Sequence, residues 1–223
     1  MSRGRLNLFR SDDDRPALQR ARRLALQTAS LATLPRPVAG FWVRALRRAK
    51  ACDDTWSIDV ACRPAELRVL LDALAGARRV AEVGTAAAWT TSCLALARPD
   101  REIMSWDVEA HPERERYLAL LSPADRARVH LHDRPGGMGP ADPPPVDAVF
   151  IDSSHEREET VATFRTWEPA LSPGGIVAFH DWQDDAYPGV TEAVRELGLV
   201  GDARGHLFVW RKPAPAPGGR RLA

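Results

Sequence analysis

The sequence predicts a doubly wound α/β fold, in which a mostly parallel sheet carries helices on both faces. Two observations predict it: short apolar runs alternate with helical patterns from residue 78 onward, and a turn joins the last two segments. Parallel strands need a crossover helix between them, whereas a tight turn joins antiparallel strands. With 223 residues, the chain is long enough for one such domain and an appendage.

Short apolar runs between polar residues predict five strands, at 79–83, 102–107, 128–132, 146–151 and 175–180. Helical patterns between them predict helices at 88–97, 112–121 and 156–168. After a further helix at 189–197, the pair Leu199–Val200, a Gly-Asp-Ala-Arg-Gly turn and a run from His206 to Trp210 predict a hairpin. The final strand is therefore expected to lie antiparallel to its neighbour.

Helical patterns also occupy the N-terminal part, at about 16–32, 38–50 and 64–76. The sequence is accordingly divided into a helical lid or dimerisation segment at 1–62, the α/β domain at 63–212 and a Pro/Gly-rich tail at 213–223, expected to be disordered.

The N-terminal segment is strongly basic. Residues 1–50 hold 12 Lys or Arg and 3 Asp, a formal charge of +9, whereas the rest holds 19 basic and 27 acidic residues, a formal charge of −8. A basic segment on an acidic body is typical of nucleic-acid or anionic-surface binding. Interleaved leucines and a scarcity of aromatic residues favour instead a helical appendage with solvent-facing arginines.

The composition, 44% hydrophobic and 27% charged, is that of a globular protein. Cys52, Cys62 and Cys93 form no C-x-x-C pair, so neither a zinc site nor a disulfide framework is indicated. No apolar run reaches the roughly 18 residues that span a bilayer. We therefore expect a cytoplasmic protein without a membrane partner.

Acidic and histidine residues follow the predicted strands. They are Glu82, Asp107, Glu109, His132, Asp133, Asp152, His155, His180 and Asp181. In a doubly wound sheet, ligands bind outside the carboxyl ends of the strands. Burying so many acids for structure alone would be costly, so a functional site is expected at this rim.

Residues 78–211 resemble the class I S-adenosylmethionine-dependent methyltransferases, in the branch of bacterial small-molecule O-methyltransferases and cephalosporin-hydroxylase-like proteins. The matching residues are Ile151, Asp152, His155, Trp167, Leu171, Pro173, Gly174, Gly175, His180 and Asp181. The resemblance implies a Rossmann-like sheet of seven strands that ends in a reversed hairpin. It also implies S-adenosylmethionine as cofactor.

The resemblance implies a cofactor site at the ends of the first four strands, formed by Glu82, Gly84, Thr85, Asp107, Asp133 and Asp152. Asp107 is implied to bind both ribose hydroxyls, and Asp133 to lie near adenine. Ala88 occupies a later glycine position of the usual motif, which predicts weakened rather than abolished binding. If that position requires a positive φ, alanine is strained there.

Asp152, His180 and Asp181 match the positions where metal-dependent relatives bind a divalent ion. Carboxylates suit Mg²⁺, whereas the imidazole of His180 suits a transition metal better. His155 matches the position of a catalytic lysine, and an imidazole of ordinary pKa can act as a general base near neutral pH. We therefore expect His155 and Asp152 to be catalytic, with Mg²⁺ or another divalent metal held nearby. A structural hydrogen-bonded role for both histidines stays open.

The leading hypothesis is methylation of a hydroxyl on a small, natural-product-like acceptor of secondary metabolism, with a homodimer as a candidate assembly. A methyltransferase fold that binds the cofactor without transferring methyl stays open. A nucleic-acid methyltransferase is disfavoured because the body is acidic and lacks an Asn-Pro-Pro-Tyr-like motif.

Overall fold

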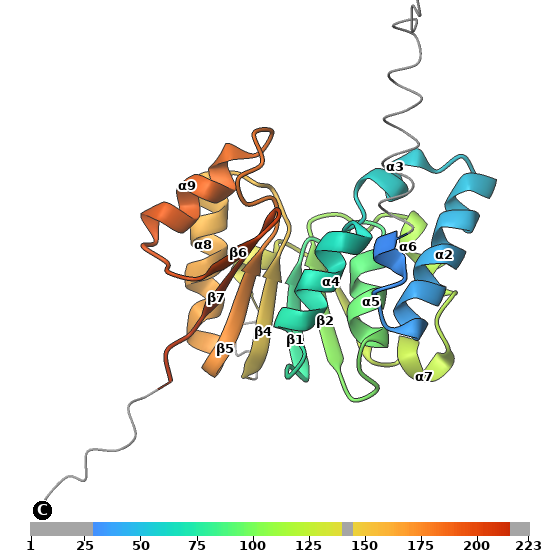
Figure 1. The fold of residues 1–223 in the computed structure, drawn as a ribbon, viewed down its shortest axis with the longest axis horizontal. Helices are drawn as coiled ribbons and strands as arrows, with labels where there is room; N and C mark the ends of the chain where they lie inside the picture. The colour runs from blue at the N-terminus through green and yellow to red at the C-terminus, as the bar shows by residue number, and fades with distance from the viewer. Residues whose placement is uncertain (1–28, 140–144, 215–223) are drawn as a thin grey trace, which may run out of the picture.

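The computed structural model describes residues 29–139 and 145–214. Most of the helix expected at 16–32 and most of the tail expected at 213–223 lie outside these residues. The strands are β1 (Arg79–Val83), β2 (Glu102–Asp107), β3 (Val129–Asp133), β4 (Val146–Ile151), β5 (Leu171–Phe179), β6 (Asp202–Arg204) and β7 (Leu207–Arg211). They form one sheet in the order β3-β2-β1-β4-β5-β7-β6 (Figure 1). β1 to β5 are parallel, and β7 pairs antiparallel with β5 and β6.

This arrangement confirms the predicted fold class. The helices are α2 (Arg36–Ala51), α3 (Thr55–Asp59), α4 (Pro64–Ala73), α5 (Trp89–Leu96), α6 (Glu113–Leu118), α7 (Pro123–Arg126), α8 (Arg157–Trp167) and α9 (Pro188–Glu196). The sequence analysis missed α3 and α7, which have five and four residues and therefore no hydrophobic period. Each begins at a capping side chain, Asp54 for α3 and Ser122 for α7.

The predicted hairpin is correct in direction, but its first strand and its turn lie further along the chain than predicted. Asp202–Arg204 form β6 within the stretch assigned to the turn, and Leu199–Val200 are not a strand. The chain reverses instead at Gly205, whose φ of +59° is a conformation that glycine adopts freely. β6 is short, and its charged residues Asp202 and Arg204 are exposed, which discourages pairing with another chain at this sheet edge.

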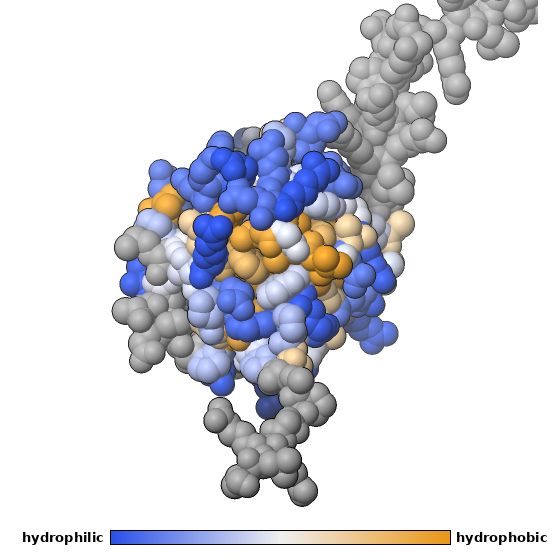
Figure 2. Space-filling model, turned by 90° about the vertical axis from the view of Figure 1, so that its left-hand side faces the viewer, coloured by the Kyte–Doolittle hydropathy of each residue, from blue (hydrophilic) through white to orange (hydrophobic). Residues whose placement is uncertain are grey.

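Figure 2 shows the side of the molecule that carries this edge, where apolar side chains gather within a polar border. In this part of the chain Val200 is 89% exposed. Leu197, Leu199 and Trp210 are partly buried against the core.

Alternating residues of the strands point to opposite faces of the sheet and build two cores. Phe150 and Ile176 belong to the first core, together with buried residues of α2, α4 and α5. Their neighbours Val149 and Val177 belong to the second core, with α8 and α9. The two groups of helices therefore cover the two faces of the sheet (Figure 1). None of the described helices is long and apolar enough to cross a lipid bilayer.

The N-terminal helix α2 shares the first core. Its residues Val38 and Phe41 are fully buried, and Trp42 packs edge-to-face on Trp89 of α5 at 5.6 Å between ring centroids. The boundary at residue 62 stays a prediction, but α2 has no separate hydrophobic core among the described residues.

Phe41→Ala tests whether α2 is part of the main core. Removing this buried ring should lower the free energy of unfolding by about 3–5 kcal/mol, measured by urea denaturation. Arg47→Ala, at an exposed position of the same helix, is the control and should change it by less than about 0.5 kcal/mol. Equal small effects would mean that α2 is not needed by the core.

Candidate active site at the carboxyl ends of the strands

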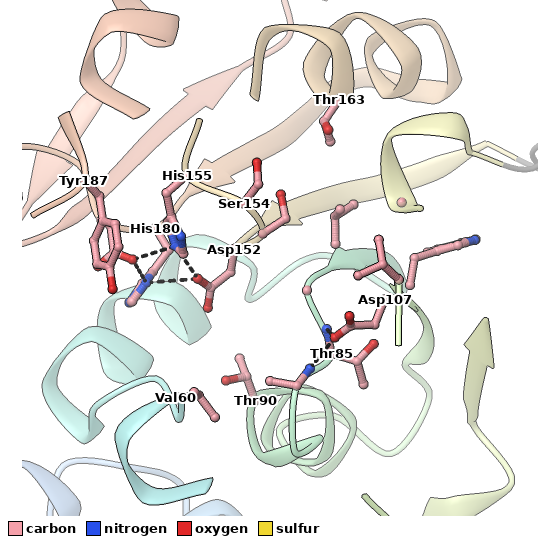
Figure 3. A pocket seen from close by; sticks show the side chains of 18 of the residues that line it. Val60, Thr85, Thr90, Asp107, Asp152, Ser154, His155, Thr163, His180 and Tyr187 are labelled. Atoms are coloured by element: carbon pink, nitrogen blue, oxygen red, sulfur yellow. Dashed lines mark hydrogen bonds and ion pairs between the residues drawn. The ribbon is translucent and has the colours of Figure 1, made fainter. Parts of the chain in front are cut away.

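A cavity of about 1000 Å³ opens at the carboxyl ends of β1, β2, β4 and β5. One end is lined by the loop after β1, by Asp107 and by Gly136–Gly137. The other end is lined by Asp152, His155, His180 and Asp181, with the segment around α3 and the start of α4 beside them. Figure 3 shows the two ends facing each other across the cavity. This volume is at the upper end of the range for small-molecule sites.

The two ends of the cavity come closest to each other at Gly84. Its φ is +105°, and a Cβ at this position would lie 1.7 Å from the carbonyl oxygen of Asp152. Any side chain would therefore push the β1 loop away from the end of β4. The main chain of Asp152 touches the loop, while its carboxylate belongs to the opposite end of the cavity.

The loop after Gly84 contains two alanines in the left-handed region. Ala86 has φ +43°, and Ala88, at the start of α5, has φ +63° and ψ +25°. The left-handed conformation costs an L-residue about 1–2 kcal/mol. Ala88 therefore occupies a position that favours glycine, as the sequence analysis considered, and its methyl group is fully buried.

Asp107 fixes this loop. Its Oδ2 accepts hydrogen bonds from the amides of Thr85 at 3.1 Å and Ala86 at 2.8 Å. The nearly buried Arg114 lies 3.1 Å from the same oxygen and donates to the carbonyl of Ala86 at 2.9 Å. Oδ1 accepts one long bond, from the amide of Glu109 at 3.3 Å. The carboxylate thus holds the loop with one oxygen and keeps the other nearly free at the cavity.

Two predicted cofactor residues lie away from the cavity lining. Asp133 is half exposed and pairs with Arg114 at 2.6 Å. Glu82 is fully buried beneath the loop, where its Oε2 accepts hydrogen bonds from Thr91 and Ser105, both at 2.5 Å. Burial raises the pKa of Glu82 to about 8, although both hydroxyls oppose the shift. Their roles in cofactor binding stay predictions.

Sequence reasoning missed several residues at this end. Arg114 was one of many arginines in the sequence, and no pattern marked it as buried. Gly136 was also passed over because its surroundings look irregular. A Cβ there would lie 2.3 Å from Val83, so the loop after β3 packs directly on β1. Trp106 and Thr163 complete this end of the lining.

The opposite end holds two carboxylates and two imidazoles, which the structure brings together as predicted. His155 Nε2 lies 2.8 Å from Asp181 Oδ2 and 3.4 Å from Asp152 Oδ1. His180 Nδ1 lies 3.2 Å from Asp152 Oδ1 and 3.1 Å from Asp181 Oδ2. We call these four residues the Asp-His centre. One donor atom from each lies within 4.8 Å of the others, as metal ligands do.

The electrostatics of the Asp-His centre differ from the sequence expectation. Burial alone would lower the pKa of His155, but Asp152 and Asp181 outweigh it and raise the pKa to about 9. The pKa of His180 is likewise raised, against burial, by the same carboxylates. The two imidazoles in turn lower the pKa values of Asp152 and Asp181, against burial. The sequence predicted that the pKa of His155 would lie near neutral. Because Asp152 and Asp181 raise this pKa, the imidazole is instead protonated at pH 7.

Two residues of the Asp-His centre also have strained backbone conformations. His155 has φ +62° and Asp181 has φ +55°. Such conformations cost an energy that the surrounding structure must offset, and they cluster at functional sites. The ring of His155 additionally stacks on Tyr187, with centroids 4.3 Å apart. The chain therefore holds these two side chains in fixed directions.

Comparison with known proteins relates part of the chain to a known family and its fold to solved structures. Residues 81–182, from β1 to the end of the Asp-His centre, match the family model of a methyltransferase domain. The matched segment, a little under half of the chain, is therefore similar to a methyltransferase domain. A search of curated protein sequences finds no significant match to this chain.

Solved structures share its fold. The SAH-bound methyltransferase PaMTH1 of Podospora anserina aligns with a TM-score of 0.63 at 13% identity, over 96% of this chain and 100% of that chain. The O-methyltransferase TomG of Streptomyces achromogenes, in complex with SAM, aligns with 0.56 at 19% identity, over 81% and 91%. CalS11, a TDP-rhamnose 3′-O-methyltransferase of calicheamicin biosynthesis, aligns with 0.52 at 18% identity, over 93% and 99%.

Ala88→Gly and Ala87→Gly together measure the strain in the loop. Both alanines are buried, but only Ala88 has a positive φ. Ala87→Gly should destabilise the protein by about 1–2 kcal/mol, because it loses a buried methyl group and gains unfolded-state freedom. Ala88→Gly loses as much but releases about 1–2 kcal/mol of strain, so its stability should stay within about 1 kcal/mol of wild type. Equal losses in urea denaturation would contradict the strain.

Glu82→Gln tests the buried carboxyl. With a folded pKa near 8 and an unfolded pKa near 4.5, Glu82 binds an extra proton in the folded state between these values. It therefore lowers stability as pH rises through this window, by up to about 1.4 kcal/mol per pH unit. Urea denaturation between pH 5 and 8 should show a shallower decline for the glutamine variant than for wild type. Parallel curves would show that Glu82 does not titrate in this window.

Proposed function

We propose that this protein is a methyltransferase, which transfers a methyl group from S-adenosylmethionine to a hydroxyl oxygen of a small-molecule acceptor. The observation that carries the proposal is the single cavity that joins a nucleotide-type loop to the Asp-His centre across the contact of Gly84 with Asp152. Hydroxyl groups need to lose a proton when they accept a methyl group, and the Asp-His centre is the part of the described cavity equipped to take it.

The loop end of the cavity fits the cofactor. Gly84 and Gly136 let the loops after β1 and β3 pack closely against neighbouring main chain and strand, which shapes this end of the cavity. The less occupied Oδ1 of Asp107 is suited to accept from ribose hydroxyls. When bound, the cofactor supplies an already activated methyl group. The residues of the chain therefore need only to align the acceptor with it and to exclude water.

The donor set of the Asp-His centre fits a divalent metal. Ligands about 2.1 Å from an ion lie about 3.0–3.4 Å from one another in octahedral or tetrahedral arrangements. The two separations between His180 Nδ1 and the carboxylate oxygens of Asp152 and Asp181, 3.2 and 3.1 Å, lie in this range. Both ring nitrogens of His180 are buried and make no regular hydrogen bond within the described chain.

Asp152, Asp181 and His180 would hold the ion, and nitrogen donors favour a transition metal over Mg²⁺. A bound ion would supply a positive charge that lowers the pKa of an acceptor hydroxyl. It would also offset the carboxylates that raise the pKa of His155 and so leave that imidazole free to accept a proton.

His155 is suited to receive the acceptor proton. Its ring lies in the cavity wall between Asp181 and Tyr187, and Tyr187 is 42% exposed at the cavity. The stacked pair offers an aromatic surface for a ring-shaped acceptor. Phenolic and sugar hydroxyls are the acceptor classes to test first, since the O-methyltransferase CalS11, which shares the fold, acts on a rhamnose.

Three substitutions, distributed over the two ends of the cavity, test the proposal. Asp181→Ala should abolish nearly all transfer of radiolabelled methyl groups to an accepted phenol or sugar while leaving affinity for S-adenosylhomocysteine intact. Asp107→Ala should weaken that affinity by about 1.5–3 kcal/mol in calorimetry, because charge-assisted hydrogen bonds are lost. His155→Ala should lower kcat by roughly 10²–10⁴ at neutral pH.

The result that would contradict the proposal is a fully active Asp181→Ala enzyme, or wild-type protein that binds no cofactor at millimolar concentration. Full activity in EDTA would contradict both the metal and the role of His155 as proton acceptor, because its imidazole is protonated at pH 7 without the ion. Unchanged rates in His155→Ala would make that histidine structural.

A further inference from the structure

His180 is contacted from two sides by parts of the chain far apart in the sequence. Nδ1 faces Asp152 and Asp181 at the strand ends. Nε2 faces Oε2 of Glu66, at 3.5 Å, from the start of α4. An imidazole that directs one nitrogen to a site needs its other nitrogen held, since the second contact fixes the tautomer and the direction of the ring.

Glu66 is itself fixed by the way its helix begins. It is the third residue of α4, after Arg63 and Pro64, and its Oε2 accepts the backbone N–H of Arg63 at 3.2 Å. The same oxygen faces His180. The next residue, Leu67, and Leu70, one turn further on, are 1% and 0% exposed and anchor the helix in the first core. The start of α4 therefore fixes the position of the Glu66 carboxylate, which cannot move freely with the His180 ring.

We propose that Glu66 is a positioning residue, which accepts the Nε2–H of His180 and keeps Nδ1 directed at Asp152 and Asp181. The inference rests on the proposed function in so far as the Asp-His centre is its working site. It gives α4 a part in the chemistry: the helix carries one member of a carboxylate–histidine pair that orients a ligand of the centre. Such partners typically change metal affinity by 10–100-fold.

Cys62 offers the rival arrangement. It is 3% exposed, and its sulfur lies within 4.8 Å of donor atoms of Glu66 and His180. A metal ion on this side would use Nε2 of His180 as a ligand instead of leaving it to donate a hydrogen bond. The contact of Glu66 Oε2 with the Arg63 amide favours the hydrogen-bonded arrangement, because it already holds this oxygen at the helix start.

Glu66→Gln is the direct test, because its amide oxygen can still accept from Arg63 and preserve the helix start, while the negative charge that strengthens the contact with His180 Nε2–H is lost. The measurements are Mn²⁺ binding by calorimetry and the imidazole N–H signals in proton–nitrogen NMR, with the His180 signal assigned by its loss in His180→Gln. We expect 10–100-fold weaker Mn²⁺ binding and a shifted, faster-exchanging His180 signal, with S-adenosylhomocysteine affinity unchanged. The control is Asp72→Asn, on the same helix but paired with Arg68 at the surface, and it should match wild type.

A Glu66→Gln protein with wild-type Mn²⁺ affinity and an unaltered His180 signal would overturn the inference. Wild-type protein that binds no Mn²⁺ would count against the metal in the proposed function, and the NMR signal alone would then decide the role of Glu66. In protein loaded with Co²⁺, a sulfur-to-metal absorption band that disappears in Cys62→Ser would place the ion on the Cys62 side and contradict the inference.

Discussion

The close contact of Gly84 with the carbonyl of Asp152 is the constraint on which the site depends. β1 and β4 are neighbours in the sheet, and both end at the same rim. Because residue 84 has no side chain, the loop after β1 can lie directly against the main chain that carries the Asp152 carboxylate. A cofactor bound in the loop is thereby brought next to the Asp-His centre. Without this contact the two ends of the cavity would be separate surfaces.

Charge is organised differently at the two ends. At the loop end, Arg114 neutralises Asp107 and Asp133 and fixes the loop through the carbonyl of Ala86. At the other end, two imidazoles face two carboxylates, and Glu66 adds a third carboxylate from outside. The first arrangement gives a rigid binding surface. The second concentrates groups that exchange protons or bind cations, held by strained backbone at His155 and Asp181.

Most of the sheet was predictable from the sequence because parallel strands leave a strong local signal. β1, β2 and β4 lie where short apolar runs placed them, and acids at their ends marked the rim. The start of β5 was missed, because Leu171–Gly174 carry a proline and a glycine that resemble a turn. The first strand of the hairpin was also missed, because the residues of Asp202–Arg204 lie at the sheet edge, are exposed and show no apolar pattern.

The clustering of the four residues of the Asp-His centre was predictable from the sequence, but the contacts that surround them were not. The sequence placed Asp152, His155, His180 and Asp181 together because all follow strand ends. It gave no sign of Arg114 or Glu66, whose roles depend on how helices dock, and docking leaves no local pattern. The raised pKa of His155 likewise depends on tertiary proximity to two carboxylates.

The most direct test of the account is a crystal structure with S-adenosylhomocysteine and Mn²⁺, with the ion located by its anomalous scattering. The account predicts the nucleoside between Asp107 and Gly136, the cofactor sulfur turned toward the Asp-His centre, and the ion on Asp152, Asp181 and His180. A cofactor bound outside this cavity, or an ion bound away from these three residues, would contradict it.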